Sequence, residues 1–310
     1  MLSRIAESLF WIGRYVERAD DTARMLDVHI QSLSEDPWAS EDRALRALLA
    51  VMDHPVPDDS TLVTRALVLQ TLAHDRANPS AIAGAVVAAR ENARRAREIV
   101  SSELWECLNT TRHQVTGPLR LARPHDFFAW VRERAAVVTG IVDGSTSRDE
   151  TWTFMVLGRS IERADMTARF VQTQAELGPA GPGWHTLLRS TGAYETFLRT
   201  FRGIASDERA AEFLLLDRLF PRSVVHALDQ AEECLRSLDP GADRRGVSDE
   251  ARRELARLRA ALEYAPLEDT LSALPRIMKD VQLGCAAASD AIRSRYFPSG
   301  LATTWVGEAL

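Results

Sequence analysis

Apolar residues recur along the first thirty positions at alternating steps of four and three. The series is Ile5, Leu9, Ile12, Val16, Ala19, Ala23, Leu26 and Ile30. This spacing places the apolar side chains on one face of an α-helix, so a long amphipathic helix is predicted from about Ile5 until Pro37 ends it. A matching series predicts a second long helix over about 148–176; its members are Phe154, Leu157, Ile161, Ala164, Ala168 and Val171.

The same periodicity, interrupted by proline, glycine and capping residues, predicts helices over most of the remaining chain. The expected ranges are 41–52, 60–74 with Ser60 as its cap, 79–105, 126–142, 185–201, 207–218, 221–238, 249–264 and 267–296. An irregular polar segment is expected over 109–124, and the residues after Pro298 are expected to be less ordered unless Trp305 docks. No segment alternates β-branched and polar residues, so an all-α helical bundle is predicted.

The two long helices carry nearly the same sequence. Residues 13–24 read GRYVERADDTAR and residues 158–169 read GRSIERADMTAR, so nine of twelve positions are identical at an offset of 145. Composition alone gives roughly one match. A second pair shares the pattern D-R-x-x-P at 75–79 and 217–221, an offset of 142. Two matches in the same order indicate a duplication, with halves 1–145 and 146–310 packed about their long helices as one compact unit.

Both copies place the same charged residues in rows beside the apolar face of the helix. These candidate site residues are Arg14, Glu17, Arg18, Asp20 and Arg24 in the first copy and Arg159, Glu162, Arg163, Asp165 and Arg169 in the second. Each row also contains a glycine, Gly13 or Gly158, although glycine costs about 1 kcal/mol relative to alanine inside a helix. The repeated glycine therefore predicts close approach of a partner backbone or a ligand.

Three interpretations of these charged rows remain open. The arginines four residues apart repel each other and need an anion, which Glu17 and Glu162 could supply across a contact between the halves. Alternatively, the rows could line a pocket for an anionic or zwitterionic small molecule or a peptide end. A carboxylate metal site is the least favoured, because none of the seven histidines stands three residues after a glutamate. No metal and no cofactor are therefore expected.

The sequence also contains a second group of polar residues on one predicted helix, and it lacks the common catalytic motifs. This second polar face comprises Arg90, Glu91, Asn92 and Arg94, which form a solvated helix side or pack near the first helix, with Trp105 and Asn109 at its end. No nucleophile elbow, catalytic triad, phosphate loop or dinucleotide motif is present. A non-catalytic protein is therefore favoured, and an enzyme that uses Glu17 or Glu162 as a general base is the alternative.

Composition limits the possible partners and compartments. The net charge of −6 argues against nucleic-acid binding, which requires a basic surface. Three widely separated cysteines, Cys107, Cys234 and Cys285, form no CxxC pair and fit a reducing cytoplasm. Charges near Met1 interrupt any signal-peptide core, and no apolar run approaches the ~20 residues of a membrane helix, so no membrane partner is expected.

Several of these segments together resemble the bacterial alpha-E domain family, a helical domain named for its Glu-Arg motif. They are MLSRIA at 1–6, LFW at 9–11, GRYVERAD at 13–20, RENAR at 90–94, LGR at 157–159, ERAD at 162–165 and DRLFPRSV at 217–224. Such proteins are similar to components encoded beside, or fused to, circularly permuted ATP-grasp ligases and transglutaminase-like peptidases. The resemblance thus implies a ligase and a transglutaminase-like protein as partners in peptide or amide ligation, and it supplies no catalytic residues.

Overall fold

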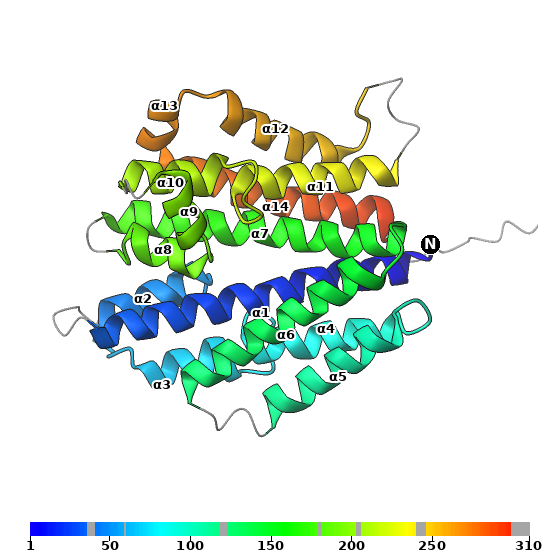
Figure 1. The fold of residues 1–310 in the computed structure, drawn as a ribbon, viewed down its shortest axis with the longest axis horizontal. Coiled ribbons are helices and arrows are strands. Elements are labelled where there is room, and N and C mark those ends of the chain that lie inside the picture. Colours follow the sequence, from blue (N-terminus) through cyan, green and yellow to red (C-terminus); the bar gives the residue numbers. More distant parts are fainter. Residues whose placement is uncertain are drawn as a thin grey trace, which may run out of the picture.

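The computed structural model describes residues 1–35, 41–58, 60–117, 123–178, 181–202, 206–239 and 246–298. Within these ranges the regular structure is entirely helical and contains no strand, so the predicted all-α class is confirmed (Figure 1). The expectations for Pro37 and Trp305 fall outside the described residues. None of the described helices is both long enough and apolar enough to cross a bilayer.

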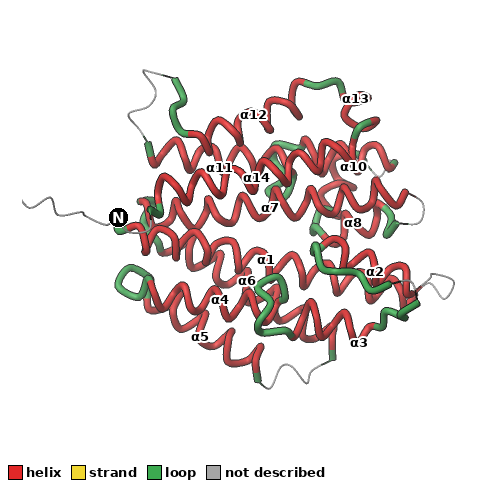
Figure 2. The backbone as a smooth tube through the Cα atoms, turned by 180° about the vertical axis from the view of Figure 1, so that it is seen from behind, coloured by secondary structure: helices red, strands yellow, loops and turns green. Residues whose placement is uncertain are grey.

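The two longest described helices run side by side through the middle of the molecule in both views (Figures 1 and 2). They are α1 (Ser3–Glu35) and α7 (Glu150–Leu177). On the side of α1 away from α7 pack α4 (Ile82–Arg95) and α6 (Pro124–Ser145). On α7 pack α11 (Val224–Leu238) and α14 (Leu274–Tyr296). Both long helices therefore lie inside the bundle.

Shorter helices close the two sides of the bundle. In the first half they are α2 (Glu41–Val51), α3 (Arg65–Val68), the π-helical turn η1 (Leu69–His74) and α5 (Ser102–Thr116). In the second half they are α8 (Trp184–Ser190), α9 (Tyr194–Thr200), α10 (Asp207–Leu216), α12 (Glu250–Tyr264) and α13 (Leu267–Ser272). α5 packs on α4 and α6, and α12 covers α11 and α14. One continuous apolar core joins both sides through α1 and α7.

Three predictions for the first half were wrong, two of them because local caps start new helices. The helix predicted over 79–105 is divided into α4 and α5, since the Ser101 hydroxyl accepts a hydrogen bond from the Leu104 amide at 3.2 Å and starts α5. α5 continues to Thr116, so part of the segment predicted to be irregular is helical. The helix predicted from Ser60 begins instead at Arg65, where the Thr64 side chain forms the cap.

Two predicted helices in the second half were also too long. The range 185–201 is broken between α8 and α9, where Gly192 adopts a φ of +68°. Such a backbone conformation suits glycine and ends a helix. The range 267–296 is divided into α13 and α14, and Pro275 stands in the first turn of α14. Proline lacks an amide hydrogen, so it is tolerated at a helix start and disfavoured in its interior.

Gly13 and Gly158 lie where the backbones of α1 and α7 come closest. A Cβ atom added to Gly13 would stand 2.0 Å from the carbonyl oxygen of Met155 on α7. A Cβ atom added to Gly158 would stand 2.0 Å from the carbonyl oxygen of Phe10 on α1. Since no side chain fits at such distances, the two glycines allow one helix backbone to rest on the other. This contact sets the position of the charged rows that follow each glycine.

Candidate functional site at the contact of α1 and α7

Glu162 of α7 is fully buried and accepts hydrogen bonds from two arginines of α1. The Nε atom of Arg14 donates to it at 2.6 Å. Arg18 donates from Nε at 2.5 Å and from Nη2 at 2.9 Å. Arg14 also donates to the Ser289 hydroxyl of α14 at 3.0 Å. The carboxylate of one long helix thus neutralises the like-charged pair of the other.

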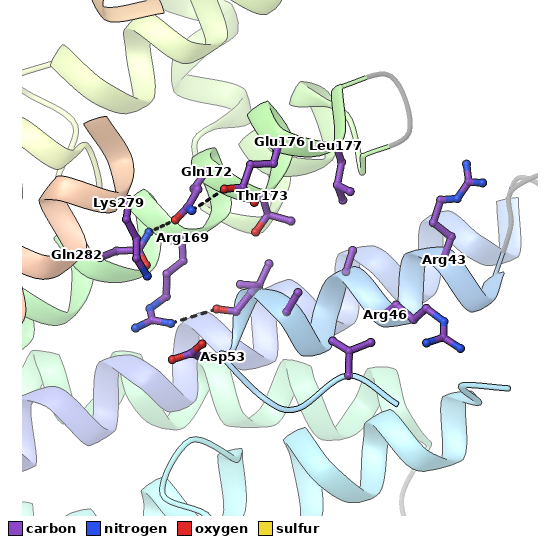
Figure 3. Close-up of a pocket in the computed structure, with 14 residues that line it drawn as sticks. Arg43, Arg46, Asp53, Arg169, Gln172, Thr173, Glu176, Leu177, Lys279 and Gln282 are labelled. Carbon is purple, nitrogen blue, oxygen red and sulfur yellow. Dashed lines mark hydrogen bonds between the residues drawn. The ribbon is translucent and has the colours of Figure 1, made fainter. Parts of the chain in front are cut away.

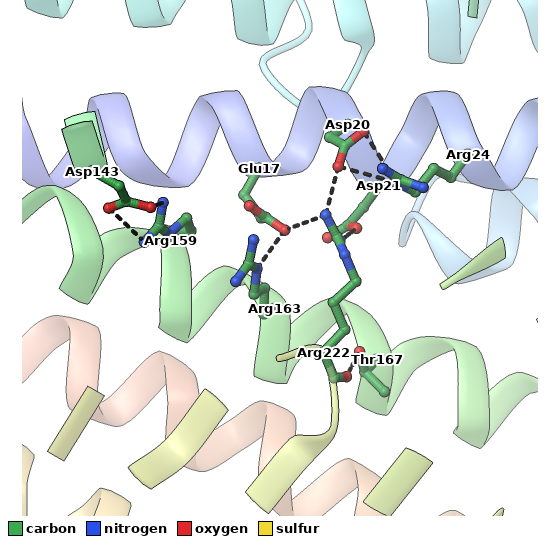
Figure 4. Close-up of polar contacts among 9 residues, drawn as sticks. All are labelled: Glu17, Asp20, Asp21, Arg24, Asp143, Arg159, Arg163, Thr167 and Arg222. Atoms are coloured by element: carbon green, nitrogen blue, oxygen red, sulfur yellow. Dashed lines mark hydrogen bonds and ion pairs between the residues drawn. The ribbon is translucent and has the colours of Figure 1, made fainter. Parts of the chain in front are cut away.

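Glu17 of α1 takes the reciprocal position toward α7 (Figure 4). Its carboxylate accepts a hydrogen bond from Arg163 Nε at 2.7 Å. A second guanidinium reaches the same carboxylate from outside the two long helices, because Arg222 Nη2 lies 2.8 Å from Glu17 Oε1. Glu17 and Glu162 are therefore each held by two arginines, and both carboxylates are buried.

Arg222 connects the segment before α11 to three acidic residues of α1. Its guanidinium pairs with Asp20 at 2.5 Å and with Asp21, in addition to Glu17. The Arg222 carbonyl accepts a hydrogen bond from the Thr167 hydroxyl at 2.9 Å, which fixes this segment against α7. Side chains from three parts of the chain thus meet at one point, as Figure 4 shows.

Glu17, Asp20 and Asp21 are also the described residues best placed to bind a metal ion. One carboxylate oxygen from each lies within 4.8 Å of the others, and all three residues are buried. The Arg222 guanidinium, however, already contacts all three carboxyl groups and provides the positive charge that a metal ion would bring. A metal ion would have to displace it, so this set of residues does not fit a metal centre.

The other predicted site residues lie toward the two ends of the contact. Arg24 donates to Asp20 at 3.0 Å, and Arg169 donates to Asp165 at 2.9 Å. Arg159 donates to Asp143 of α6 at 3.2 and 3.3 Å. All ten predicted residues are thus brought to the α1–α7 contact or its margins, and each has a protein partner.

The second polar face lies away from this contact, between α4 and α5. Arg90 donates to the Asn109 side chain at 2.9 Å, and its guanidinium lies 4.9 Å from the centre of the Trp105 ring. Arg94 pairs with Glu91 at 2.5 Å on the exposed side of the helix. Asn92 donates to the carbonyl of Ala88 in its own helix. These contacts join α4 to α5 and stabilise the helix surface.

Comparison with known families identifies the chain. Residues 1–297 match the model of Alpha-E, described as a predicted alpha-helical domain with a conserved ER motif. The chain belongs to the Alpha-E family. The predicted resemblance is thereby confirmed over nearly the whole sequence. The Glu-Arg pairs at 17–18 and 162–163 are those whose side chains bridge α1 and α7.

Curated relatives of this Alpha-E chain carry no described function. The uncharacterized proteins Mb2597 of Mycobacterium bovis and Rv2567 of Mycobacterium tuberculosis are each 24% identical to it over 268 residues. These alignments cover 77% of this chain and 30% of each relative. The chain therefore matches less than a third of the length of these relatives. No solved structure matches it.

The surrounding arginines determine how the two buried glutamates of the Alpha-E contact ionise. Burial alone would raise the pKa of Glu17, but Arg163 and Arg222 outweigh it and lower that pKa to about 2. Burial would likewise raise the pKa of Glu162, but Arg18 and Arg14 outweigh this effect and lower that pKa to about 2. A carboxylate with so low a pKa is a weak base at neutral pH. This environment disfavours either glutamate as a general base.

The pKa of Asp21 is shifted in the opposite direction, upward. Its complete burial raises its pKa to about 8; Arg222 opposes this increase, and the negative charges of Glu17 and Asp20 add to it. The carboxyl group of Asp21 therefore protonates before that of Glu17 as the pH falls. Burial raises the pKa of Asp165 in the same way, with Arg169 opposing the increase.

These shifts predict a maximum of thermal stability at mildly acidic pH. The lowered pKa values of Glu17 and Glu162 give a stabilisation that is present above pH 4.5 and is lost as the pH falls toward 2, on the order of 3 kcal/mol each. The raised pKa of Asp21 gives a stabilisation that is present below pH 3.8 and is lost as the pH rises toward 8. We expect the melting temperature, followed by circular dichroism, to be highest near pH 5.

The variant Asp21→Asn is the control for this pH profile. Because asparagine does not titrate, the variant should show a shallower decline between pH 5 and pH 8, with Asp165 contributing what remains, and should keep the decline below pH 4.5. A wild-type melting temperature that rises steadily from pH 5 to pH 8 would contradict the assignment of Asp21.

Two residues of the Alpha-E site, Arg222 and Asp21, were not among the predicted ones. A signal for them exists in the internal repeat. At the two offsets, Asp21 corresponds to Met166 and Arg222 corresponds to Ser80. Asp21 lies in the first copy and Arg222 in the second, and the residues that correspond to them in the opposite copies, Met166 and Ser80, carry no charge. Such a paired difference between copies indicates that the two residues interact.

Proposed function

We propose that the protein is a non-catalytic helical component of a peptide or amide ligation system, which binds an ATP-grasp-type ligase or its peptide-like substrate. The observation that carries this proposal is the length of the relatives. In them the matching region makes up 30% of a longer chain, so it is one component of a larger protein there. We propose the same kind of role, as a component that works together with other protein, for this chain.

The chemistry of the charged contact supports a binding role over catalysis. Both candidate general bases are held by two guanidinium groups and have pKa values of about 2. The resemblance to components of ATP-grasp and transglutaminase-like systems supplies the class of partner. The three cysteines are free and buried, which is compatible with the reducing cytoplasm proposed as the compartment.

Purification of the tagged full-length protein from its own host tests the proposal. We expect an ATP-grasp-type ligase to co-purify in stoichiometric amount and the ATP-dependent ligation rate of that ligase to rise at least tenfold when the protein is added. A protein with the surface substitution Arg276→Met should behave like the wild type, because Arg276 is exposed and, among the described residues, its guanidinium pairs only with Asp280.

The alternative function, an enzyme of the same pathway, predicts a different result. The isolated protein would then turn over a peptide substrate, and Glu17→Gln would abolish turnover while the circular dichroism spectrum stays unchanged. That outcome would overturn the non-catalytic proposal.

A further inference from the structure

A cavity opens beside the charged contact, where α2, α7 and the start of α14 come together (Figure 3). Its volume is about 420 Å³, which falls in the range of small-molecule binding sites. Arg169, the last member of the charged row on α7, forms part of its wall. The cavity therefore borders the ion network and shares Arg169 with it.

Two cationic side chains meet at one end of this cavity. Lys279 of α14 is the only lysine in the 310 residues, and it has no carboxylate partner among the described residues. Arg169 uses Nε for Asp165 and Nη1 for the Val51 carbonyl at 3.5 Å. Its Nη2 hydrogens have no acceptor in the described part of the chain. An ammonium group and a guanidinium edge are thus both available to one anionic group.

A chain of amide side chains lies beside these cations. Gln282 is buried, with 8% exposure, and its Nε2 atom donates to Gln172 Oε1 at 2.5 Å. Gln172 in turn donates to Glu176 at 2.6 Å, as the dashed lines in Figure 3 show. These two hydrogen bonds orient the side-chain amide of Gln282. The Oε1 atom of Gln282 can therefore accept a hydrogen bond from an N–H group of a ligand. The cavity can therefore recognise an amide as well as an anion.

The remaining walls limit the charge of a ligand. Asp53, which lies beside Arg169 in Figure 3, and Glu176 add two negative charges to the lining, whereas Arg43 adds a positive charge away from Arg169. The two carboxylates oppose a polyanion such as a nucleotide polyphosphate. Arg46 pairs with Asp42 at 2.7 Å and donates to the Pro57 carbonyl at 2.6 Å, so its role is to hold the wall in place. Val56 and Leu177 add apolar surface to the lining. These features favour a ligand with one negative charge and a partly apolar body.

The geometry points to a binding site for a short peptide, held by its C-terminal carboxylate between Lys279 and Arg169. The last peptide N–H donates to Gln282, and the side chains of the peptide lie along Val56 and Leu177. This inference rests on the proposed function, because it assigns the peptide-like substrate of the ligation system to one cavity.

The single lysine allows a direct test on the full-length wild-type protein. The probes are N-acetyl-alanyl-alanine, the same dipeptide with a C-terminal amide, and inorganic phosphate. An amine-acylating ester modifies Lys279 and the N-terminal amine, and mass spectrometry measures both. The N-terminal amine pairs with Glu150 at 3.0 Å and lies outside the cavity, so it serves as the internal reference. We expect the free acid to slow acylation of Lys279 at least fivefold and the other two probes to leave it unchanged.

Calorimetric titration of two matched variants of α14 completes the test. Lys279→Met should weaken binding of the free acid at least tenfold, whereas Arg276→Met should change it less than twofold. Equal binding of the acid and the amide, or equal losses in the two variants, would overturn the assignment. Loss of ligase co-purification while the dipeptide still binds would overturn the proposed partner and leave the cavity assignment standing. If the ligase still co-purifies but the dipeptide does not bind, the cavity assignment is overturned and the proposed partner stands.

Discussion

Replacement of Gly13 or Gly158 by alanine is expected to destabilise the protein by about 3 kcal/mol, the upper end of the usual cost of overpacking. The added Cβ atom would lie 2.0 Å from a backbone carbonyl oxygen of the facing helix. A carbonyl oxygen inside a helix cannot turn aside as a flexible side chain can, so α1 and α7 must move apart. That movement also lengthens the hydrogen bonds from the α1 arginines to Glu162. Chemical denaturation followed by circular dichroism measures the effect.

Gly140→Ala is the matched control within a helix. Gly140 is exposed on α6, and a Cβ atom added there meets nothing within 4 Å. Because alanine favours the helix over glycine, this variant should gain up to about 1 kcal/mol. The double variant Gly13→Ala/Gly158→Ala should cost less than the sum of the two single changes, since one separation of the helices relieves both clashes. A Gly13→Ala protein that unfolds at the wild-type denaturant concentration would disprove the close contact.

The repeated segment allowed much of this arrangement to be predicted from sequence. A glycine that recurs at the same level in two long helices is costly unless something comes close, and the structure shows that a helix backbone does. The arginines four residues apart likewise required an anion, and Glu162 lies between Arg14 and Arg18. These inferences were possible because each depends on residues within one helix turn or two.

Features that depend on distant parts of the chain could not be predicted in this way. Arg222 belongs to a segment two hundred residues from Asp20 and Asp21, and only the tertiary fold brings them together. The cavity beside Arg169 requires α2, α7 and α14 at once, so no local pattern marks it. Helix boundaries failed for a different reason. The turn between α4 and α5 is set by the Ser101 cap, whose effect outweighs an otherwise helical composition.

Replacement of Glu162 by glutamine should cost 3–5 kcal/mol, because it leaves Arg14 and Arg18 buried without their carboxylate. The side chain of Glu162 is 1% exposed, so water cannot take the place of the lost charge. Glu91→Gln is the control, since Glu91 pairs with Arg94 on the surface of α4. Its cost should stay within about 0.5 kcal/mol. Urea denaturation of both variants at pH 7 gives the comparison.

The triple variant Arg14→Met/Arg18→Met/Glu162→Leu separates a structural role of this network from a role in binding. Apolar side chains of similar size often replace a buried ion network at little cost, so the triple variant should regain most of the stability that Glu162→Gln loses. If it folds and still binds the dipeptide and the ligase, the charges serve only to dock α1 on α7. If it folds but loses the ligase while the dipeptide still binds at Lys279, the ion network fixes the shape of the surface that the partner contacts. A triple variant no more stable than Glu162→Gln would show that α1 and α7 need these charges to pack in their proper register.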